Sequence, residues 1–309
     1  MKIFIVTTPS SNVLTKDHIK EFKKFGSVAF IDKPQPFKKI KELYEGDEEK
    51  IIAVDPDFCA WKIPDSVLKT VPNLKAICLK TTSFNWVNTK LASKLGITVT
   101  NSKGWPAPAV VEWIIMTSFL LARKMPLMIK EGWRKDFSRY LGTELKGKTA
   151  GILGMGTIGT LLAHTCAGLG MNVTYWSKHS RDTRFTYTSI NTIITTSDFI
   201  YPVWANNEET KTLLPISLLK KVNPKGYFVD IYIAGDTHDR KTLIDMAEKG
   251  KIRGYGFEAE SGEFLKYKGN IAAIPENGWT TAESLKRNAR LWSDAIANAA
   301  KGKYPAKVN

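Results

Sequence analysis

The fold is decided by the stretch Ile152-Leu153-Gly154-Met155-Gly156-Thr157-Ile158-Gly159. An apolar run leads into Gly-x-Gly-x-x-Gly, and an apolar segment of helical character follows to about residue 169. In such a turn the first glycine bends the chain, the second lets backbone approach a pyrophosphate, and the third lets helix and strand pack closely. A strand expected over 172–176 completes a βαβ unit, so the stretch predicts a dinucleotide site. The expected binding residues of the turn are Gly154, Gly156, Thr157, Ile158 and Gly159.

The loop after residues 172–176 indicates which dinucleotide is bound. Proteins that bind NAD usually carry Asp or Glu there, which accepts hydrogen bonds from the ribose hydroxyls. This chain has Ser177 instead, followed by the cations Lys178, His179 and Arg181. Because a missing carboxylate and added cations suit a 2′-phosphate, we expect NADPH (NADP) rather than NADH.

Short apolar strands alternate with helices on both sides of the glycine turn. Strands are expected at 2–7, 28–31, 51–54, 74–79 and 97–100, then at 149–153, 172–176, 199–203, 227–231, 252–257 and 271–274. The main helices are expected at 16–24, 87–95, 107–124 and 281–300. This alternation is typical of parallel sheets covered on both faces. We therefore predict an α/β fold with two doubly wound parallel-sheet (Rossmann-like) domains.

Composition narrows the class of protein. A length of 309 residues suits two domains, and the net charge of +15 is spread along the chain without a long basic run, which argues against specific nucleic-acid binding. Cys59, Cys78 and Cys166 are far apart, as expected of a cytoplasmic protein without disulfides or structural zinc. No signal peptide is expected at the N-terminus, and the longest apolar run, 109–122, is too short to span a membrane. No metal-ligand spacing is present, so we expect no metal site.

With the glycine turn in the second half of the chain, the layout resembles the D-2-hydroxyacid dehydrogenase family. The matching segments are 101–112, which ends Val110-Val111-Glu112, then Leu145-Lys146-Gly147-Lys148, Ser197-Asp198 and 270–284. The resemblance implies a flavodoxin-like substrate-binding domain of residues 1–100 plus 284–309. A dinucleotide-binding Rossmann domain of residues 101–283 is inserted into it. It also implies a homodimer, held partly by the helix of the crossover segment.

The sequence differs from the family at the positions of the family's catalytic residues. The family uses an Arg for the substrate carboxylate and carbonyl, a His as acid/base, and a Glu that orients the His. Ala234 falls on the Arg position and Glu276 on the His position. Glu263 is the nearest match to the family Glu, with Glu260 as the alternative, and Glu258 stands where an Asp near the nicotinamide amide is usual.

A protonated imine would not need the missing groups, because its nitrogen already carries the proton and the positive charge. A carboxylate such as that of Glu276 would stabilise this cation, whereas Arg or protonated His would repel it. The chain looks like the acyclic imino acid reductases among this family's relatives, which intercept imines released by a partner amino-acid oxidase. We therefore expect a small 2-imino acid as substrate and a D-amino acid as product.

The substrate would be held by residues from both halves of the chain. The turn Thr81-Thr82-Ser83-Phe84 matches the family's carboxylate-binding turn, although its glycines are replaced. Tyr232 and Trp279 fall beside the replaced positions and are expected to line the pocket, with Tyr232 also a candidate proton donor. Acids near the strand ends favour a cationic substrate side chain.

Two other interpretations stay open. The first is a 2-oxo acid reductase, or D-2-hydroxyacid dehydrogenase, whose acid has been relocated to His238 or Tyr232. The second is a catalytically silent sensor that binds the dinucleotide and turns nothing over.

Overall fold

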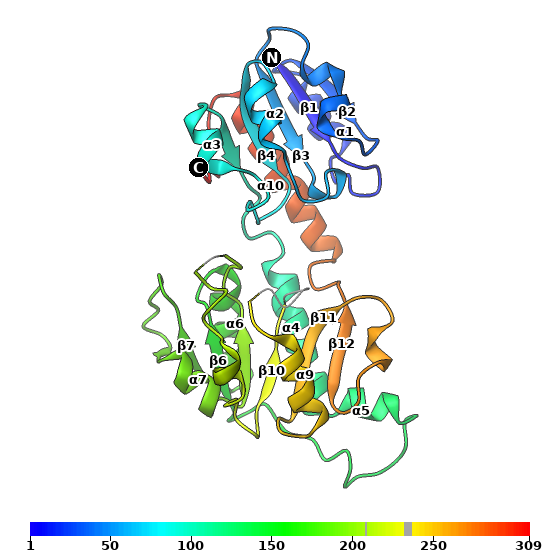
Figure 1. Cartoon of the computed structure of the whole chain (residues 1–309), viewed down its shortest axis with the longest axis vertical. Coiled ribbons are helices and arrows are strands. Elements are labelled where there is room, and N and C mark those ends of the chain that lie inside the picture. Colours follow the sequence, from blue (N-terminus) through cyan, green and yellow to red (C-terminus); the bar gives the residue numbers. More distant parts are fainter. Residues whose placement is uncertain (208, 232–236) are drawn as a thin grey trace. The chain divides into compact units, whose positions relative to one another are not determined.

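The computed structural model describes residues 1–207, 209–231 and 237–309 and forms two compact units (Figure 1). Unit 1 comprises Met1–Pro106 and Thr281–Asn309, and unit 2 comprises Ala107–Thr280. The bounds expected from the sequence, 1–100 with 284–309, lie a few residues from these. Unit 2 is thus inserted into unit 1 along the sequence, as the resemblance to the dehydrogenase family implies.

Unit 1 is a five-stranded parallel sheet in the order β2-β1-β3-β4-β5. Its strands are β1 (Lys2–Val6), β2 (Ser27–Ile31), β3 (Lys50–Val54), β4 (Leu74–Leu79) and β5 (Thr98–Thr100). Its helices are α1 (Lys16–Phe22), α2 (Asp65–Thr70), α3 (Thr89–Lys94) and α10 (Ala282–Ala300), with short 3₁₀ turns η1 (Phe37–Lys39), η2 (Lys41–Leu43) and η3 (Pro56–Phe58).

The C-terminal helix α10 belongs to the core of unit 1. Its fully buried Trp292 and Ile296 pack with Ile3, Ile5 and neighbouring residues on one face of the sheet. Thr281 caps the helix by accepting a hydrogen bond from the backbone N–H of Ser284, which fixes where the chain re-enters this unit. The expected helix at 281–300 is therefore present, and it closes the first unit from the far end of the sequence.

Unit 2 is a seven-stranded sheet in the order β12-β11-β10-β9-β6-β7-β8, and all its strand pairs are parallel. Its strands are β6 (Thr149–Leu153), β7 (Asn172–Trp176), β8 (Thr186–Tyr187), β9 (Phe199–Pro202), β10 (Tyr227–Val229), β11 (Gly254–Ala259) and β12 (Ile271–Pro275). Its helices are α4 (Ala107–Ala122), α5 (Met125–Lys130), α6 (Thr157–Gly168), α7 (Ile190–Thr196), α8 (Ile216–Leu219) and α9 (Arg240–Glu248), with the 3₁₀ turn η4 (Glu263–Leu265).

Both faces of this second sheet are buried. Alternate strand residues enter two separate cores, so that Phe199 and Tyr201 pack beneath α4 and α6 whereas Ile200 packs towards α7 and α8. This burial on both faces explains why the strands read as continuous apolar runs. The predicted fold class, two doubly wound parallel-sheet domains with one inserted into the other, is confirmed.

The differences from the expected elements have local causes. The crossover helix ends at Ala122 rather than 124, because Lys124 adopts a left-handed backbone with φ of 54° and α5 starts directly after it. No glycine in the sequence marks this helix end, so the apolar periodicity predicted a helix that continued to residue 124. The short elements α2 and β8 were not expected, since six and two residues are too few for a periodic signal.

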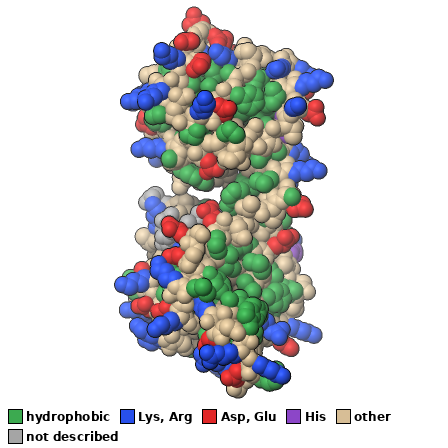
Figure 2. All heavy atoms as spheres, turned by 90° about the vertical axis from the view of Figure 1, so that its right-hand side faces the viewer, with side chains coloured by type: hydrophobic (Ala, Val, Ile, Leu, Met, Phe, Trp, Pro, Cys, Tyr) green, Lys and Arg blue, Asp and Glu red, His purple; other side chains and the backbone are tan. Residues whose placement is uncertain are grey.

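The surface agrees with the spread of charge along the sequence. Lys and Arg side chains are scattered over the visible face of both units rather than gathered in one patch (Figure 2). Among the described residues, no helix is long and apolar enough to cross a membrane.

Candidate active site

The glycine turn joins β6 to α6 through two close backbone approaches. Gly154 has a φ of 109°, and a Cβ there would lie 2.7 Å from backbone atoms of Trp204. A Cβ at Gly159 would lie 1.9 Å from the carbonyl oxygen of Gly154. Both positions therefore require glycine for folding. Gly154 needs it for its positive φ and its contact with the loop after β9, and Gly159 needs it for the close packing of helix and strand.

Gly156 has a different reason to be glycine. It is exposed at the N-cap of α6, and a Cβ there would meet nothing within 4 Å. The open space faces the N-terminus of a 12-residue helix, where Thr157 is also exposed and the helix dipole favours an anion. Ile158, by contrast, packs partly buried against the core. The residues of this turn fit the pyrophosphate of a dinucleotide.

Substitution of the two glycines separates folding from binding. We expect Gly154→Ala to lower the free energy of unfolding by about 2 kcal/mol, because alanine is strained at that φ and meets Trp204. Gly156→Ala should leave thermal unfolding nearly unchanged and weaken dinucleotide binding, because its methyl group fills the space that the cofactor needs.

The measurements are thermal unfolding and fluorescence titration with NADPH for both variants. Full affinity in Gly156→Ala would contradict the assignment of the binding turn.

The loop after β7 carries the expected cations. Ser177 is buried, and its hydroxyl accepts a hydrogen bond from the backbone N–H of Ser180. Arg181 donates to the carbonyl of Ser177 at 2.7 Å, and its guanidinium lies 4.0 Å from the ring centroid of Tyr187. Lys178 and His179 are exposed. The loop is thus ordered by Ser177 and Arg181 and presents positive charge where the adenosine ribose of a bound dinucleotide lies.

Glu258 lies near the end of β11 and is a buried carboxylic acid. One of its oxygens accepts hydrogen bonds from the backbone N–H groups of Gly278 at 2.8 Å and Asn277 at 3.2 Å. Burial, together with the negative charges of Glu276 and Asp230, raises the pKa of the Glu258 carboxyl to about 7, against the lowering effect of these bonds. At neutral pH this carboxyl is therefore partly protonated.

The raised pKa links folding to pH. Between the ordinary Glu value of 4.5 and about 7 the folded chain binds the proton that the unfolded chain releases, so stability is full below that window and falls as pH rises through it. From pH 4.5 to 8 the loss from this group is at most about 3 kcal/mol, since each pH unit between the two pKa values contributes about 1.4 kcal/mol.

Glu258→Gln should remove this dependence. Urea unfolding of both proteins at several pH values checks it, and an unchanged pH profile in the variant would contradict the titration of Glu258.

The turn after β12 carries the carboxylate predicted to replace the family His. Glu276 is exposed, and the indole Nε1 of Trp279 donates to it at 3.3 Å. The next residue, Asn277, accepts a hydrogen bond from Trp113 Nε1 at 3.0 Å. Together with the two bonds to Glu258, these contacts fix the turn that holds Glu276 and Trp279 on the same sheet edge as the glycine turn.

Other predicted site residues are placed differently. Glu263 starts η4, and its pairing with Lys266 at 2.8 Å lowers the pKa of its carboxyl. No hydrogen bond joins it to Glu276 in the described part of the chain. The alternative, Glu260, is exposed just beyond β11. Tyr232 and Ala234 lie outside the described residues.

His238 is fully enclosed rather than presented to a substrate. Its Nε2 is 3.0 Å from Asp230, its Nδ1 is 3.0 Å from the hydroxyl of Thr237, and Tyr255 donates to the same Asp230 carboxylate. Arg240 lies 3.6 Å from the other oxygen of Asp230. Both ring nitrogens are therefore engaged in a buried network that anchors the end of β10, which speaks against His238 as a relocated acid.

The predicted carboxylate-binding turn of unit 1 follows β4. Its carbonyl groups are held inward: Ser83 accepts a hydrogen bond from Trp86 Nε1 at 2.9 Å, and Thr82 accepts one from Asn101 at 2.6 Å. Thr82, Ser83 and Phe84 are exposed, and none of the described residues accepts a hydrogen bond from their backbone N–H groups. The turn therefore presents donors suited to a small carboxylate.

Charged groups lie at both ends of the carboxyl edge of unit 2. Glu258, near the end of β11, and Glu276, after β12, lie at one end of the strand order. Lys178 and Arg181 follow β7 near the other end, where Glu209 of the loop after β9 pairs with Lys178 at 2.9 Å. Because the glycine turn lies between these groups, a dinucleotide across this edge would place its pyrophosphate at the turn, its adenosine end towards the cations and its reactive ring towards the two acids. No cluster of possible metal ligands is present among the described residues.

Comparison with known proteins agrees with this geometry. Residues 115–282 match the family described as D-isomer specific 2-hydroxyacid dehydrogenase, NAD binding domain. The chain belongs to this family. It is therefore an oxidoreductase whose second unit binds a nicotinamide dinucleotide, and the family predicted from the sequence is confirmed.

Several known proteins are similar to this chain in sequence or in structure. A glyoxylate reductase of Thermococcus litoralis is 29% identical over 282 residues, covering 84% of this chain and 85% of that protein. The structure of an acyclic imino acid reductase in complex with NADPH and D-Arg matches with a TM-score of 0.84 at 21% identity, over the whole of both chains. A glyoxylate reductase from Paecilomyes thermophila matches with a TM-score of 0.86 at 19% identity, over all of this chain and 98% of the other. At such identities the two structures show the shared fold alone.

Proposed function

We propose that this dehydrogenase-family chain is an NADPH-dependent reductase of acyclic 2-imino acids, supplied by a partner amino-acid oxidase, that forms D-amino acids. The observation that carries the proposal is the exposed carboxylate of Glu276 at the position of the family's acid/base histidine, on a turn fixed by Glu258 and Trp113. The imino acid reductase of similar fold, which binds NADPH and D-Arg, fits the same proposal.

Hydride addition to a protonated imine requires the protein to position the substrate and to stabilise its positive charge. When bound, the nicotinamide supplies a hydride. The iminium carbon of the substrate accepts it, and the C=N double bond becomes a single bond as its electron pair moves to nitrogen, leaving a neutral amine. The carboxylate of Glu276 favours the protonated form of the imine. Because that nitrogen already carries its proton, no acid has to protonate a carbonyl oxygen. For unit 1 we propose that the exposed backbone N–H groups of Thr82, Ser83 and Phe84 bind a carboxylate.

The runner-up is reduction of a 2-oxo acid, as the glyoxylate reductase relative performs. The observation in its favour is Glu258, whose pKa of about 7 leaves a protonated carboxyl available at neutral pH. This residue replaces His238 as the best candidate for a relocated acid.

A paired assay distinguishes the two reactions. NADPH or NADH consumption is followed with an amino-acid oxidase generating the imine in place, and separately with the corresponding 2-oxo acid without amine. We expect oxidation of NADPH at least about tenfold faster with the oxidase present, and a loss of about ten- to a hundredfold in Glu276→Gln, because the carboxylate acts on the charged substrate.

Glu144→Gln, which removes an exposed carboxylate elsewhere in unit 2, is the control and should retain full activity. Equal or faster turnover of the oxo acid without amine would overturn the imine proposal.

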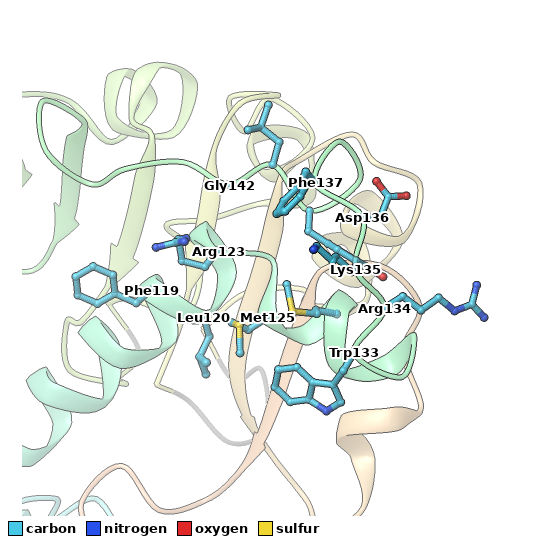
Figure 3. Close-up of a pocket in the computed structure, with 13 residues that line it drawn as sticks. Phe119, Leu120, Arg123, Met125, Trp133, Arg134, Lys135, Asp136, Phe137 and Gly142 are labelled. Carbon is cyan, nitrogen blue, oxygen red and sulfur yellow. The ribbon is translucent and has the colours of Figure 1, made fainter.

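We also propose a homodimer formed through the end of α4 and the segment that follows it. Phe119, Trp133, Phe137 and Leu141 are large apolar side chains with 43% to 81% exposure. They line a hollow of about 790 Å³ together with Met125 and Arg123. Figure 3 shows Phe119, Trp133 and Phe137 around it. Monomers rarely expose so many large apolar groups together, and a second copy of the same surface would cover them.

Sedimentation tests this surface. The wild type should sediment as a dimer at micromolar concentration and Phe137→Asp as a monomer, because a buried charge opposes association. Leu265→Asp, at a similarly exposed apolar residue in unit 2, should remain dimeric. A dimeric Phe137→Asp protein would contradict the assignment.

A further inference from the structure

We propose that Glu209 determines the cofactor specificity of this chain, acting as an internal anion that occupies the place of a 2′-phosphate. The inference rests on the proposed function, because it assumes that the loop after β7 receives the phosphorylated ribose of NADPH. It adds a residue that the sequence did not indicate, from a different loop.

Glu209 contacts two side chains of that loop, Lys178 and His179. Its Oε2 lies 2.9 Å from Lys178 Nζ and 3.2 Å from His179 Nε2. These bonds lower the pKa of the Glu209 carboxyl, so it stays ionised at neutral pH. One carboxylate oxygen thus makes the charge-assisted contacts that a phosphate oxygen would make at the same donors.

The bridge spans the dinucleotide site. Glu209 belongs to the loop after β9 and Lys178 to the loop after β7, and these two strands flank β6 in the sheet. Close by, the ring of Trp176, the last residue of β7, meets the ring of Trp204 in the loop after β9, and their centroids are 5.9 Å apart. Because β6 ends in the glycine turn, the ion pair crosses the edge where the adenosine end of a bound dinucleotide lies.

Arg181 is left out of this pairing. Its guanidinium donates to the carbonyls of Ser177 and Ser180 and stacks on Tyr187, and it pairs with no carboxylate in the described ranges. Its guanidinium is therefore available to bind a phosphate directly. Lys178 and His179 can bind the phosphate only after they release Glu209.

Competition at these donors affects the two cofactors differently. A 2′-phosphate is repelled by the Glu209 carboxylate and binds Lys178 and His179 only when that carboxylate moves away. A 2′-hydroxyl is uncharged and leaves the bridge intact. Glu209 therefore weakens NADPH binding and leaves NADH binding unchanged, which sets the ratio of the two affinities.

Fluorescence titration with NADPH, NADH and 2′,5′-ADP tests the inference. Glu209→Gln should tighten NADPH and 2′,5′-ADP about three- to tenfold and leave NADH within about twofold, since exposed ion pairs contribute modestly. Glu49→Gln removes an equally exposed carboxylate that pairs with Lys75 in unit 1, and should change none of the three.

The other outcomes contradict the inference. Weaker NADH binding in Glu209→Gln would make Glu209 a ligand of the ribose hydroxyls, and unchanged affinities would show that it does not compete. Lys178→Ala and Arg181→Ala separate this from the proposed function. If neither variant weakens NADPH binding, the assignment of the 2′-phosphate site is wrong. If both variants weaken NADPH binding and Glu209→Gln leaves it unchanged, only the role of Glu209 is wrong.

Discussion

The parallel direction of all seven strands in unit 2 is the constraint on which the rest of the site depends. Because the strands run the same way, the residues that follow β6, β7, β9, β11 and β12 all meet at one edge. Gly154 and Gly159 permit the tight joint between β6 and α6 that makes this edge usable. Segments separated by more than a hundred residues of chain thereby contribute to one binding surface.

The charged groups along this edge fit the proposed chemistry. A dinucleotide bound there would have its adenosine end beside the cations after β7 and its reactive end towards Glu258 and Glu276. Burial raises the pKa of Glu258 to about 7, whereas Glu276 is exposed. A protonated imine is stabilised by a neighbouring carboxylate such as that of Glu276, whereas the neutral carbonyl of an oxo acid gains no such stabilisation.

The sequence predicted the fold well because the relevant signals are local. The glycine turn and the apolar strands each occupy a few consecutive residues, and both are present, as is the helix expected from about residue 281. Side-chain pairing between distant loops has no such signal. Neither the pairing of Glu209 with Lys178 nor the enclosure of His238 by Asp230 and Thr237 could be predicted, since both depend on how loops meet across the sheet. The raised pKa of Glu258 likewise depends on burial against a turn twenty residues later in the chain.

The reverse reaction tests the central claim, which is that the enzyme reduces a C=N bond rather than a C=O bond. The purified chain is mixed with NADP⁺ at alkaline pH and either D-arginine or a D-2-hydroxy acid, and NADPH formation is followed by absorbance. The account predicts NADPH formation with the D-amino acid and none with the hydroxy acid. Oxidation of the hydroxy acid, with the D-amino acid left unchanged, would contradict it.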